Sequence, residues 1–351
     1  MKRCGIVGYG RIGSGQGRDY ELLPRIYFPY SLAEAIDLSH EGFLSGVSDV
    51  SAAALNQVPA GVQKFTSHEE MLNMVRLDFL AVTTRAPDRF AIFEFGVKKG
   101  IKLFHLEKPL CSSFVELDKL RLACADGAIN FTYGTLRRHL RPYRLVKELI
   151  DSAKFGKIKK ITVNYGAANL FWTHPHSIDL ILFYIGEHRE FRIDDVVGGA
   201  VNSRSFENRE EIVTDPEIDL VVLSFDDDRS AEITNIPAQS ISIQCGSYEF
   251  RINKDGREVV LLDTLGSESV IWSEVELKST EGFKLVLDGL LSPNTSMETF
   301  HGKRAMLDAI EGQEILFKIC LTLFLKQKPK SFSIDQNRCY FKAMDVSGLF
   351  A

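Results

Sequence analysis

Residues 1–13, MKRCGIVGYGRIG, place a short apolar run directly before glycines at positions 8, 10 and 13. An apolar run of this length is consistent with a buried parallel strand. In a dinucleotide-binding turn, the first glycine permits the tight turn, the second lets the backbone approach the pyrophosphate, and the third allows close helix–strand packing. The phosphates then face N–H groups at a helix N-terminus. The pattern therefore predicts a dinucleotide site formed by Gly8, Tyr9, Gly10, Arg11, Ile12 and Gly13.

The residues after this turn alternate between strand-like and helix-like segments. Strand-length apolar runs lie at 3–7, 43–48, 77–83, 101–106 and 129–133, and helix-period apolar positions lie at 31–40, 67–75, 88–99 and 113–126. Such alternation is typical of a parallel sheet with helices on both faces. We therefore predict an α/β protein whose dinucleotide-binding domain, residues 1–133, is a Rossmann-type doubly wound parallel sheet.

The pattern changes beyond residue 133. A helix is expected at 141–154, followed by strand-like runs at 158–165, 197–202, 218–225, 230–235, 240–245, 247–252 and 270–278, and by a long helix near 302–326. Turn sequences such as FDDDRS, between two of these runs, favour hairpins. We predict that residues 134–351 form an α+β domain with a large, mainly antiparallel open sheet.

The composition excludes several classes of protein. Lys and Arg total 42 against 47 Asp and Glu, so the net charge is −5, which gives no attraction to nucleic acid or an anionic membrane. No apolar run approaches the roughly 18 residues of a membrane helix, and the N-terminus lacks a signal-peptide pattern. The six cysteines are scattered without a CxxC pair, which indicates reduced, buried thiols. We expect a soluble cytoplasmic protein.

Asp49 ends the second strand-like run, where a carboxylate accepts hydrogen bonds from the adenosine ribose. It lies 36 residues beyond Gly13 instead of about 20, so we expect an insertion between them. The alternative is that Asp49 only caps the helix-like run SAAAL that follows it. Because no Arg or Lys follows Asp49 closely, the sequence favours NAD over NADP as the cofactor.

Glu107-Lys108-Pro109 follows the run IKLFHL, at the sheet edge where open α/β sheets bind ligands. Pro109 biases Lys108 away from helical geometry, so the lysine side chain is held at the strand tip. A lysine there can bind a substrate hydroxyl and assist its proton transfer. The alternative is an ordinary solvated lysine.

With Glu-Lys-Pro placed after GYGRIG, the sequence resembles the glucose–fructose oxidoreductase / inositol dehydrogenase / MocA-like (Gfo/Idh/MocA) family. The resemblance covers most of the chain through the ordered motifs GYGRIG, SD, TTRAP, HLEKPL, FGKI and HSIDLILFYIG. It implies an NAD(P)-dependent oxidoreductase of carbohydrate metabolism, acting on a hydroxyl or carbonyl of a sugar, sugar acid or nucleotide-linked sugar. It also implies that the second domain covers the site and supports a homodimer or homotetramer.

The resemblance also assigns roles to individual residues. Lys108 becomes the catalytic lysine, preceding a possible cis bond to Pro109, and His176 becomes the general base or acid. Cofactor contacts are implied for Thr83, Thr84, Pro87, Glu107 and Lys108. In many members an aspartate stands four residues before this histidine, where this chain has Trp172. That departure keeps two alternatives open: an NAD-retaining non-redox enzyme, such as an eliminating glycosidase or dehydratase, and a cofactor-binding regulatory protein with a decayed site.

Other polar residues are candidates for the substrate. Arg137 and Arg138 could grip a carboxylate or phosphate bidentately, and the alternative for both is a solvated face. Further substrate candidates are Tyr165, Trp172 and His174. A metal held by His174, His176 and Asp179 is the less favoured interpretation, because the resemblance explains His176 without one and Asp179 is expected to brace the fold.

Overall fold

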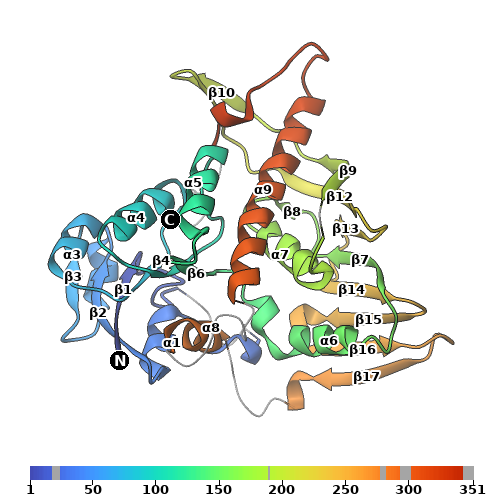
Figure 1. Cartoon of the computed structure of the whole chain (residues 1–351), viewed down its shortest axis with the longest axis horizontal. Helices are drawn as coiled ribbons and strands as arrows, with labels where there is room; N and C mark the ends of the chain where they lie inside the picture. Colours follow the sequence, from blue (N-terminus) through green and yellow to red (C-terminus); the bar gives the residue numbers. More distant parts are fainter. Residues whose placement is uncertain (18–23, 189, 277–281, 293–301, 343–351) are drawn as a thin grey trace. The chain divides into compact units, whose positions relative to one another are not determined.

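The computed structural model describes residues 1–17, 24–188, 190–276, 282–292 and 302–342. The chain divides into two compact units, which we describe one at a time (Figure 1). Unit 1 comprises Met1–Leu23, Tyr27–Leu136 and Thr280–Ile310, and unit 2 comprises Pro24–Ile26, Arg137–Ser279 and Glu311–Ala351. Unit 1 thus extends slightly past residue 133 and also includes the later segment Thr280–Ile310.

Unit 1 is built on a parallel sheet, six-stranded over the described residues. Its strands are β1 (Lys2–Val7), β2 (Gly42–Ser48), β3 (Gln63–Phe65), β4 (Phe79–Val82), β5 (Leu103–Leu106) and β6 (Asn130–Tyr133). Their order is β3-β2-β1-β4-β5-β6, and every neighbouring pair is parallel. The order reverses on either side of β1, which defines a doubly wound Rossmann-type sheet and confirms the predicted fold class.

Helices cover both faces of this sheet. On one face lie α1 (Leu32–Leu38), α2 (Ala52–Asn56) and α8 (Gly282–Leu291), and on the other lie α3 (His68–Met74), α4 (Ala86–Lys98) and α5 (Phe114–Cys124) (Figure 1). Serines at the N-caps of α1, α2, α3 and α5 accept backbone N–H bonds and so fix where these helices begin. The helix α8 belongs to unit 1 because it contacts α1 and β6, and Leu287 and Leu291 are fully buried in the core of this unit.

Unit 2 contains a nine-stranded sheet over its described residues. Its strands are β7 (Ile158–Asn164), β8 (Ala168–Asn169), β9 (Phe191–Gly198), β12 (Glu217–Phe225), β13 (Ser230–Thr234), β14 (Ser240–Cys245), β15 (Tyr248–Asn253), β16 (Glu258–Leu262) and β17 (Glu268–Ser273). The order is β17-β16-β15-β14-β7-β13-β12-β8, with β9 also paired to β12. Every pairing is antiparallel except that of β13 with β7. The predicted mainly antiparallel sheet is confirmed.

One face of this sheet is buried under helices. Apolar residues alternate along β7 and β14, where Ile161, Val163 and Ile243 are fully buried. The unit also contains α6 (Arg141–Asp151), α7 (His174–Ile185) and the C-terminal part of α9 (Gly302–Lys326). Short 3₁₀ turns lie at Arg137–His139, Lys254–Gly256, Glu274–Glu276 and Gln336–Arg338, and a further one, Arg25–Tyr27, begins in this unit and ends in unit 1. A small separate sheet joins β10 (Ser203–Phe206), β11 (Arg209–Ile212) and β18 (Cys339–Phe341).

Two strand predictions need correction. The run at 197–202 is not one strand: β9 occupies Phe191–Gly198 and β10 begins at Ser203. The run at 270–278 is strand only to Ser273, and residues 277 and 278 lie outside the described residues. All six cysteines are free and buried, as predicted. Within the described residues, none of the helices combines the length and apolar character needed to span a bilayer.

Candidate active site

The glycines of the turn after β1 differ in the space around them. Gly8 has φ +92°, and a Cβ added there would lie 2.9 Å from the Thr84 backbone nitrogen. A Cβ on Gly13 would lie 2.3 Å from the Gly8 carbonyl oxygen, whereas one on Gly10 would meet no atom within 4 Å. A tight turn at the first glycine, open space at the second and close packing at the third are the features a bound pyrophosphate requires. The turn therefore fits a dinucleotide.

The helix that follows the turn is interrupted. Ser14 and Gly15 donate backbone bonds to Gly10 and Arg11, which makes one helical turn. The Leu32 and Ala33 N–H groups then bond the Ile12 and Gly13 carbonyls at 3.0 and 2.9 Å, where an unbroken helix would use residues 16 and 17. The chain between them is thus an insertion of 32 − 16 = 16 residues, after which α1 continues the same helix.

This insertion accounts for the unusual position of Asp49. Removing 16 residues from the separation of 36 leaves 20, the ordinary spacing for the ribose-binding carboxylate. Asp49 Oδ2 accepts the Tyr9 N–H at 2.6 Å, and Oδ1 accepts the Ser51 N–H at 2.7 Å. The N-cap of α2 is Ser51 and not Asp49. The carboxylate therefore joins the end of β2 to the glycine turn.

Valine at position 10 should separate cofactor binding from folding. Because the space around Gly10 is open, Gly10→Val should leave the melting temperature within about 2 °C, yet its side chain would block the approach of a pyrophosphate. We expect NADH affinity, measured by fluorescence titration, to fall at least about tenfold by that steric argument. Gly199 in unit 2 is the control, since it is exposed and an added Cβ would make only ordinary contacts, so Gly199→Val should leave NADH affinity unchanged. Unchanged NADH affinity in Gly10→Val would contradict the assignment.

The loop after β4 uses one threonine hydroxyl and leaves the next one free. The Thr83 N–H bonds the Val7 carbonyl at 2.9 Å, and its Oγ1 donates to the carbonyls of Val7 and Gly8. Thr83 thereby fixes the glycine turn against β4. Thr84 Oγ1 is buried and has no hydrogen-bond partner among the described residues. A buried hydroxyl without a partner costs free energy, so Thr84 is suited to bind a ligand group at this edge.

The Glu-Lys-Pro segment after β5 rests on a buried polar cluster. Glu107 is 5% exposed; its carboxylate accepts bonds from His105 Nε2 at 3.4 Å and from the Lys108 N–H at 3.2 Å. His105 Nδ1 pairs with Thr132 Oγ1 at 3.0 Å. A Cβ at Gly134 would lie 2.5 Å from Glu107 Oε2, so glycine is required there. The Lys108–Pro109 bond is cis, as the resemblance implies.

Burial raises the pKa of the Glu107 carboxyl. The hydrogen bond from His105 and the charges of His105, Lys108 and Arg89 lower this pKa by more. The pKa of Glu107 therefore lies below its usual value. Glu107 is therefore ionised at neutral pH and holds the backbone of Lys108 by a charge-assisted bond.

The candidate cofactor and catalytic residues of unit 1 all follow the carboxyl ends of parallel strands, so they lie at one edge of the sheet. They are Gly8–Gly13, Asp49, Thr84 and Lys108.

The predicted histidines lie at the start of α7 in unit 2. His176 is the third residue of this helix and is half-buried, whereas His174 is fully buried with Nδ1 3.1 Å from Ser177 Oγ. Trp172, just before the helix, is 46% exposed. The segment is held by Asp215, whose carboxylate accepts the Phe171 N–H at 2.8 Å. His176 and Trp172 are thus accessible, while His174 is a core residue.

His174 should make stability depend on pH. Burial lowers the pKa of its imidazole from 6.5 to about 4, so between these pH values the unfolded chain binds more protons and stability falls as the pH falls. The loss amounts to about 3 kcal/mol at most, at about 1.4 kcal/mol for each pKa unit. Urea unfolding at pH 7 and pH 4.5 should show a smaller pH dependence for His174→Gln than for the parent. His40→Gln, at an exposed histidine, is the control. An identical pH dependence in His174→Gln would contradict this assignment.

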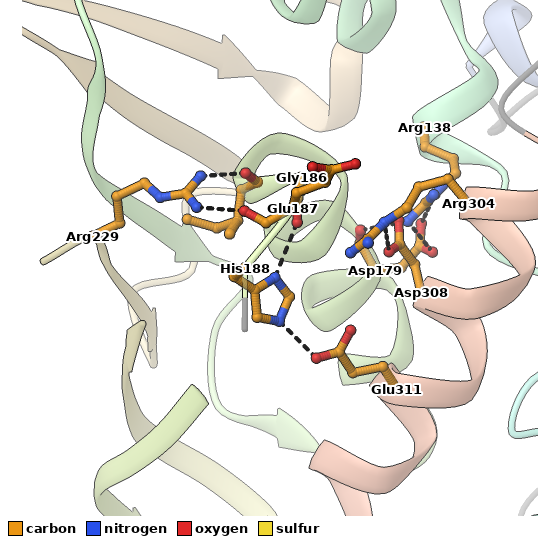
Figure 2. A network of polar contacts seen from close by, with 10 residues as sticks. Arg138, Asp179, Gly186, Glu187, His188, Arg229, Arg304, Asp308 and Glu311 are labelled. Atoms are coloured by element: carbon orange, nitrogen blue, oxygen red, sulfur yellow. Dashed lines mark hydrogen bonds and ion pairs between the residues drawn. The ribbon is translucent and has the colours of Figure 1, made fainter. Parts of the chain in front are cut away.

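The structure changes the interpretation of the arginine pair. Arg138 is 3% exposed, and its Nη2 lies 2.8 Å from the Asp179 carboxylate (Figure 2). Its guanidinium also lies over the Phe183 ring. Asp179 does brace the fold, and we no longer expect Arg138 to grip a substrate anion. Arg137 pairs with Asp255 at 2.7 Å and lies over the Tyr165 ring.

Tyr165 remains a substrate candidate only as a neutral hydroxyl, because burial raises its pKa to about 12. Within the described part of the chain, no three His, Cys, Asp or Glu side chains lie together as a metal site.

Unit 1 also has a hollow of about 780 Å³ lined by Lys2, Asp78, Lys102 and Asn130. These residues start the strands or precede them, so this hollow lies at the opposite edge of the sheet from the glycine turn.

Several supporting residues gave little or no signal in the sequence. Arg89, His105 and Gly134 surround the Glu-Lys-Pro segment, and Asp215 supports the start of α7. The signal available for Arg89 was its place, next to Asp88, among the apolar residues at the start of α4, APDRFAIF. Asp215 lies 44 residues from its partner Phe171, so no local pattern could have connected them.

Comparison with known families gives the same class as the geometry. Residues 2–132 match the family model GFO_IDH_MocA, an oxidoreductase family with an NAD-binding Rossmann fold. This match over the N-terminal domain confirms the resemblance drawn from the sequence.

Solved structures resemble the chain over nearly its full length. The UDP-N-acetylglucosamine 3-dehydrogenase of Acidithiobacillus ferrooxidans is 15% identical with a TM-score of 0.65, covering 92% of this chain and 99% of that one. The 3-ketoreductase KijD10 of Actinomadura kijaniata, with NADP, is 11% identical with a TM-score of 0.66, covering 90% and 95%. An oxidoreductase of Agrobacterium radiobacter, with NAD⁺, L-tartaric acid and magnesium, is 12% identical with a TM-score of 0.60, covering 91% and 96%. At these identities the likeness establishes the fold.

Proposed function

We propose that this protein is an NAD(P)-dependent oxidoreductase that transfers a hydride between nicotinamide and a hydroxyl or carbonyl carbon of a sugar, sugar acid or nucleotide-linked sugar. The observation that carries the proposal is the joint placement of the open glycine turn, the unpartnered Thr84 hydroxyl and Lys108 at one sheet edge. The family of residues 2–132 and the sugar-nucleotide dehydrogenase fold support it.

The chemistry divides between a bound cofactor and the chain. Oxidation of a secondary alcohol removes a hydride from carbon and a proton from oxygen, and the nicotinamide supplies the hydride acceptor. Lys108, held by the ionised Glu107, would donate a hydrogen bond to the reacting oxygen and lower the pKa of the hydroxyl. His176 would accept the proton, because a neutral imidazole is available near pH 7. In the reverse direction His176 returns the proton to the carbonyl oxygen.

The position of Asp49 favours NAD as the preferred cofactor. Its carboxylate lies beside the glycine turn, where it would bind ribose hydroxyls and repel a 2′-phosphate. We expect NADH to bind more tightly than NADPH. In Asp49→Ala the ratio of the two dissociation constants should shrink at least about tenfold, the effect of one lost hydrogen bond to a charged group. Fluorescence titration of both dinucleotides measures this. Equal affinities in the unsubstituted protein would refute the preference.

A screen tests the proposed activity directly. The protein is mixed with NAD⁺ or NADP⁺ and a panel of sugars, sugar acids and nucleotide-linked sugars, and absorbance is followed at the reduced nicotinamide band. The proposal predicts substrate-dependent reduction of the cofactor. Failure to bind either dinucleotide would contradict it. Conversion of a sugar without accumulation of reduced cofactor would indicate the NAD-retaining non-redox alternative.

A cofactor-binding regulatory protein is the second candidate. It is favoured by Trp172, which is 46% exposed at the position where many relatives have an aspartate beside the histidine. Dinucleotide binding without conversion of any screened substrate would favour it. We further propose assembly as a homodimer or homotetramer, which light scattering of the purified protein would measure.

A further inference from the structure

Arg89 is a buried cation in unit 1 with no part in the mechanism described so far. It lies in the first turn of α4 and is 3% exposed. Full burial of an arginine is costly unless its donors are satisfied and its charge is compensated. Its surroundings therefore indicate what the residue does.

The Arg89 guanidinium joins two loops of the predicted site. Nη2 donates to the carbonyl oxygen of Thr84, in the loop after β4, and Nη1 donates to the carbonyl oxygen of Pro109, in the loop after β5. The strands β4 and β5 are parallel neighbours, so the two loops leave the same sheet edge side by side. Pro109 directly follows Lys108. One planar group thus fixes the spacing between Thr84 and the lysine backbone.

The same arginine is electrostatically coupled to Glu107. Burial lowers the pKa of Arg89 to about 10, while the Glu107 charge acts in the opposite direction. The positive charge of Arg89 in turn helps to keep Glu107 ionised. The Glu107 carboxylate accepts the Lys108 N–H, and the Arg89 guanidinium donates to the carbonyl of Pro109, the next residue. Charged side chains therefore hold the backbone at Lys108 itself and directly after it.

We propose that Arg89 is a positioning residue for Lys108, which clamps the loops after β4 and β5 so that Thr84 and Lys108 keep a fixed separation. This inference rests on the proposed function in taking Lys108 as the group that acts on substrate. The clamp itself is a property of unit 1 and is present whether or not a substrate is bound.

Hydrogen exchange tests the clamp without any substrate. In Arg89→Met, amide exchange measured by mass spectrometry should rise at least about tenfold in peptides covering 83–88 and 106–111, since two charge-assisted bonds are lost. Exchange in β6 (Asn130–Tyr133) should not change. Arg121→Met, at a 43% exposed arginine of α5, is the matched control. Unchanged exchange in both loops would overturn the proposal. Arg89→Lys, which keeps the charge, serves the same test should the methionine variant not fold.

Kinetics with the substrate from the screen tests the effect on Lys108. We expect kcat to fall about 100-fold in Arg89→Met, the effect of a small misplacement, and about tenfold in Arg89→Lys. NADH affinity should stay within about threefold, because the glycine turn is untouched. Faster exchange with unchanged kcat, or a lower kcat without faster exchange, would overturn the positioning role. Full activity of Lys108→Ala would instead refute the role given to Lys108, and no turnover in the screen would refute the proposed function. In both cases the exchange result would still decide the clamp.

Discussion

Lys108→Ala is expected to lower kcat at least about a hundredfold while leaving NADH affinity nearly unchanged. Removal of a positioned acid–base group typically costs about 10²–10⁴ in rate. The Lys108 backbone is held by the ionised Glu107 and follows β5, whereas the pyrophosphate contacts expected of the cofactor lie in the glycine turn after β1. Lys108→Ala should therefore lower kcat without changing dinucleotide affinity.

His176→Ala should give a loss of similar size. The double variant should lose less than the product of the two losses, because in the proposed mechanism both groups act on one proton. Steady-state kinetics with the screened substrate measures kcat, with Lys102→Ala, at an exposed lysine before β5, as the control. The two alternative proton acceptors are poorly suited: His174 is buried with a pKa of about 4, and Tyr165 has a pKa of about 12. Near-full activity in both single variants would refute the assignment of Lys108 and His176 as the acid–base groups.

Arg138→Met is expected to destabilise the protein by about 3–5 kcal/mol, because breaking a buried ion pair leaves a charge uncompensated. Arg138 and Asp179 are both 3% exposed, and the guanidinium also donates to the Asp179 carbonyl at 2.9 Å (Figure 2). Replacing both residues, as Arg138→Met with Asp179→Leu, should recover much of the loss, since neither charge of this pair is then left buried without the other.

Urea unfolding measures this destabilisation. Arg192→Met is the matched control, because Arg192 is 77% exposed in its pair with Asp194 and should contribute less than about 1 kcal/mol. A loss below about 1 kcal/mol in Arg138→Met would contradict the structural role. An unchanged stability together with a raised KM would restore the original interpretation of Arg138 as an anion-binding residue.

Local patterns were sufficient for most of unit 1. Five of its six described strands lie in the predicted apolar runs, and serine caps mark where four of its helices begin. The short strand β3 (Gln63–Phe65) and the helix α2 were not among the predicted segments; only one of the three residues of β3 is buried. The helix α8 could not be assigned to this unit, because its packing against α1 depends on contacts about 250 residues apart in the chain, such as that of Ser39 with Asp288. In β9, Asp194 and Asp195 interrupt the alternation that identifies a strand.

In the candidate site, too, residues with a local role were predictable and residues that depend on distant partners were not. The glycine turn was predictable because each glycine has a local backbone role, and the spacing to Asp49 correctly indicated an insertion. The role of Arg138 was not predictable, since its partner Asp179 lies 41 residues away and burial decides whether an arginine binds a ligand or the fold.

The most direct test of hydride transfer uses a sugar substrate deuterated at the carbon to be oxidised. The protein is incubated with this substrate and NAD⁺, and the reduced cofactor is analysed by mass spectrometry and NMR. We predict one deuterium at C4 of the nicotinamide for each sugar oxidised, and a rate of this transfer at least about a hundredfold lower in Lys108→Ala. Oxidation of the sugar without deuterium in the cofactor, or an unchanged rate of transfer in Lys108→Ala, would contradict this mechanism.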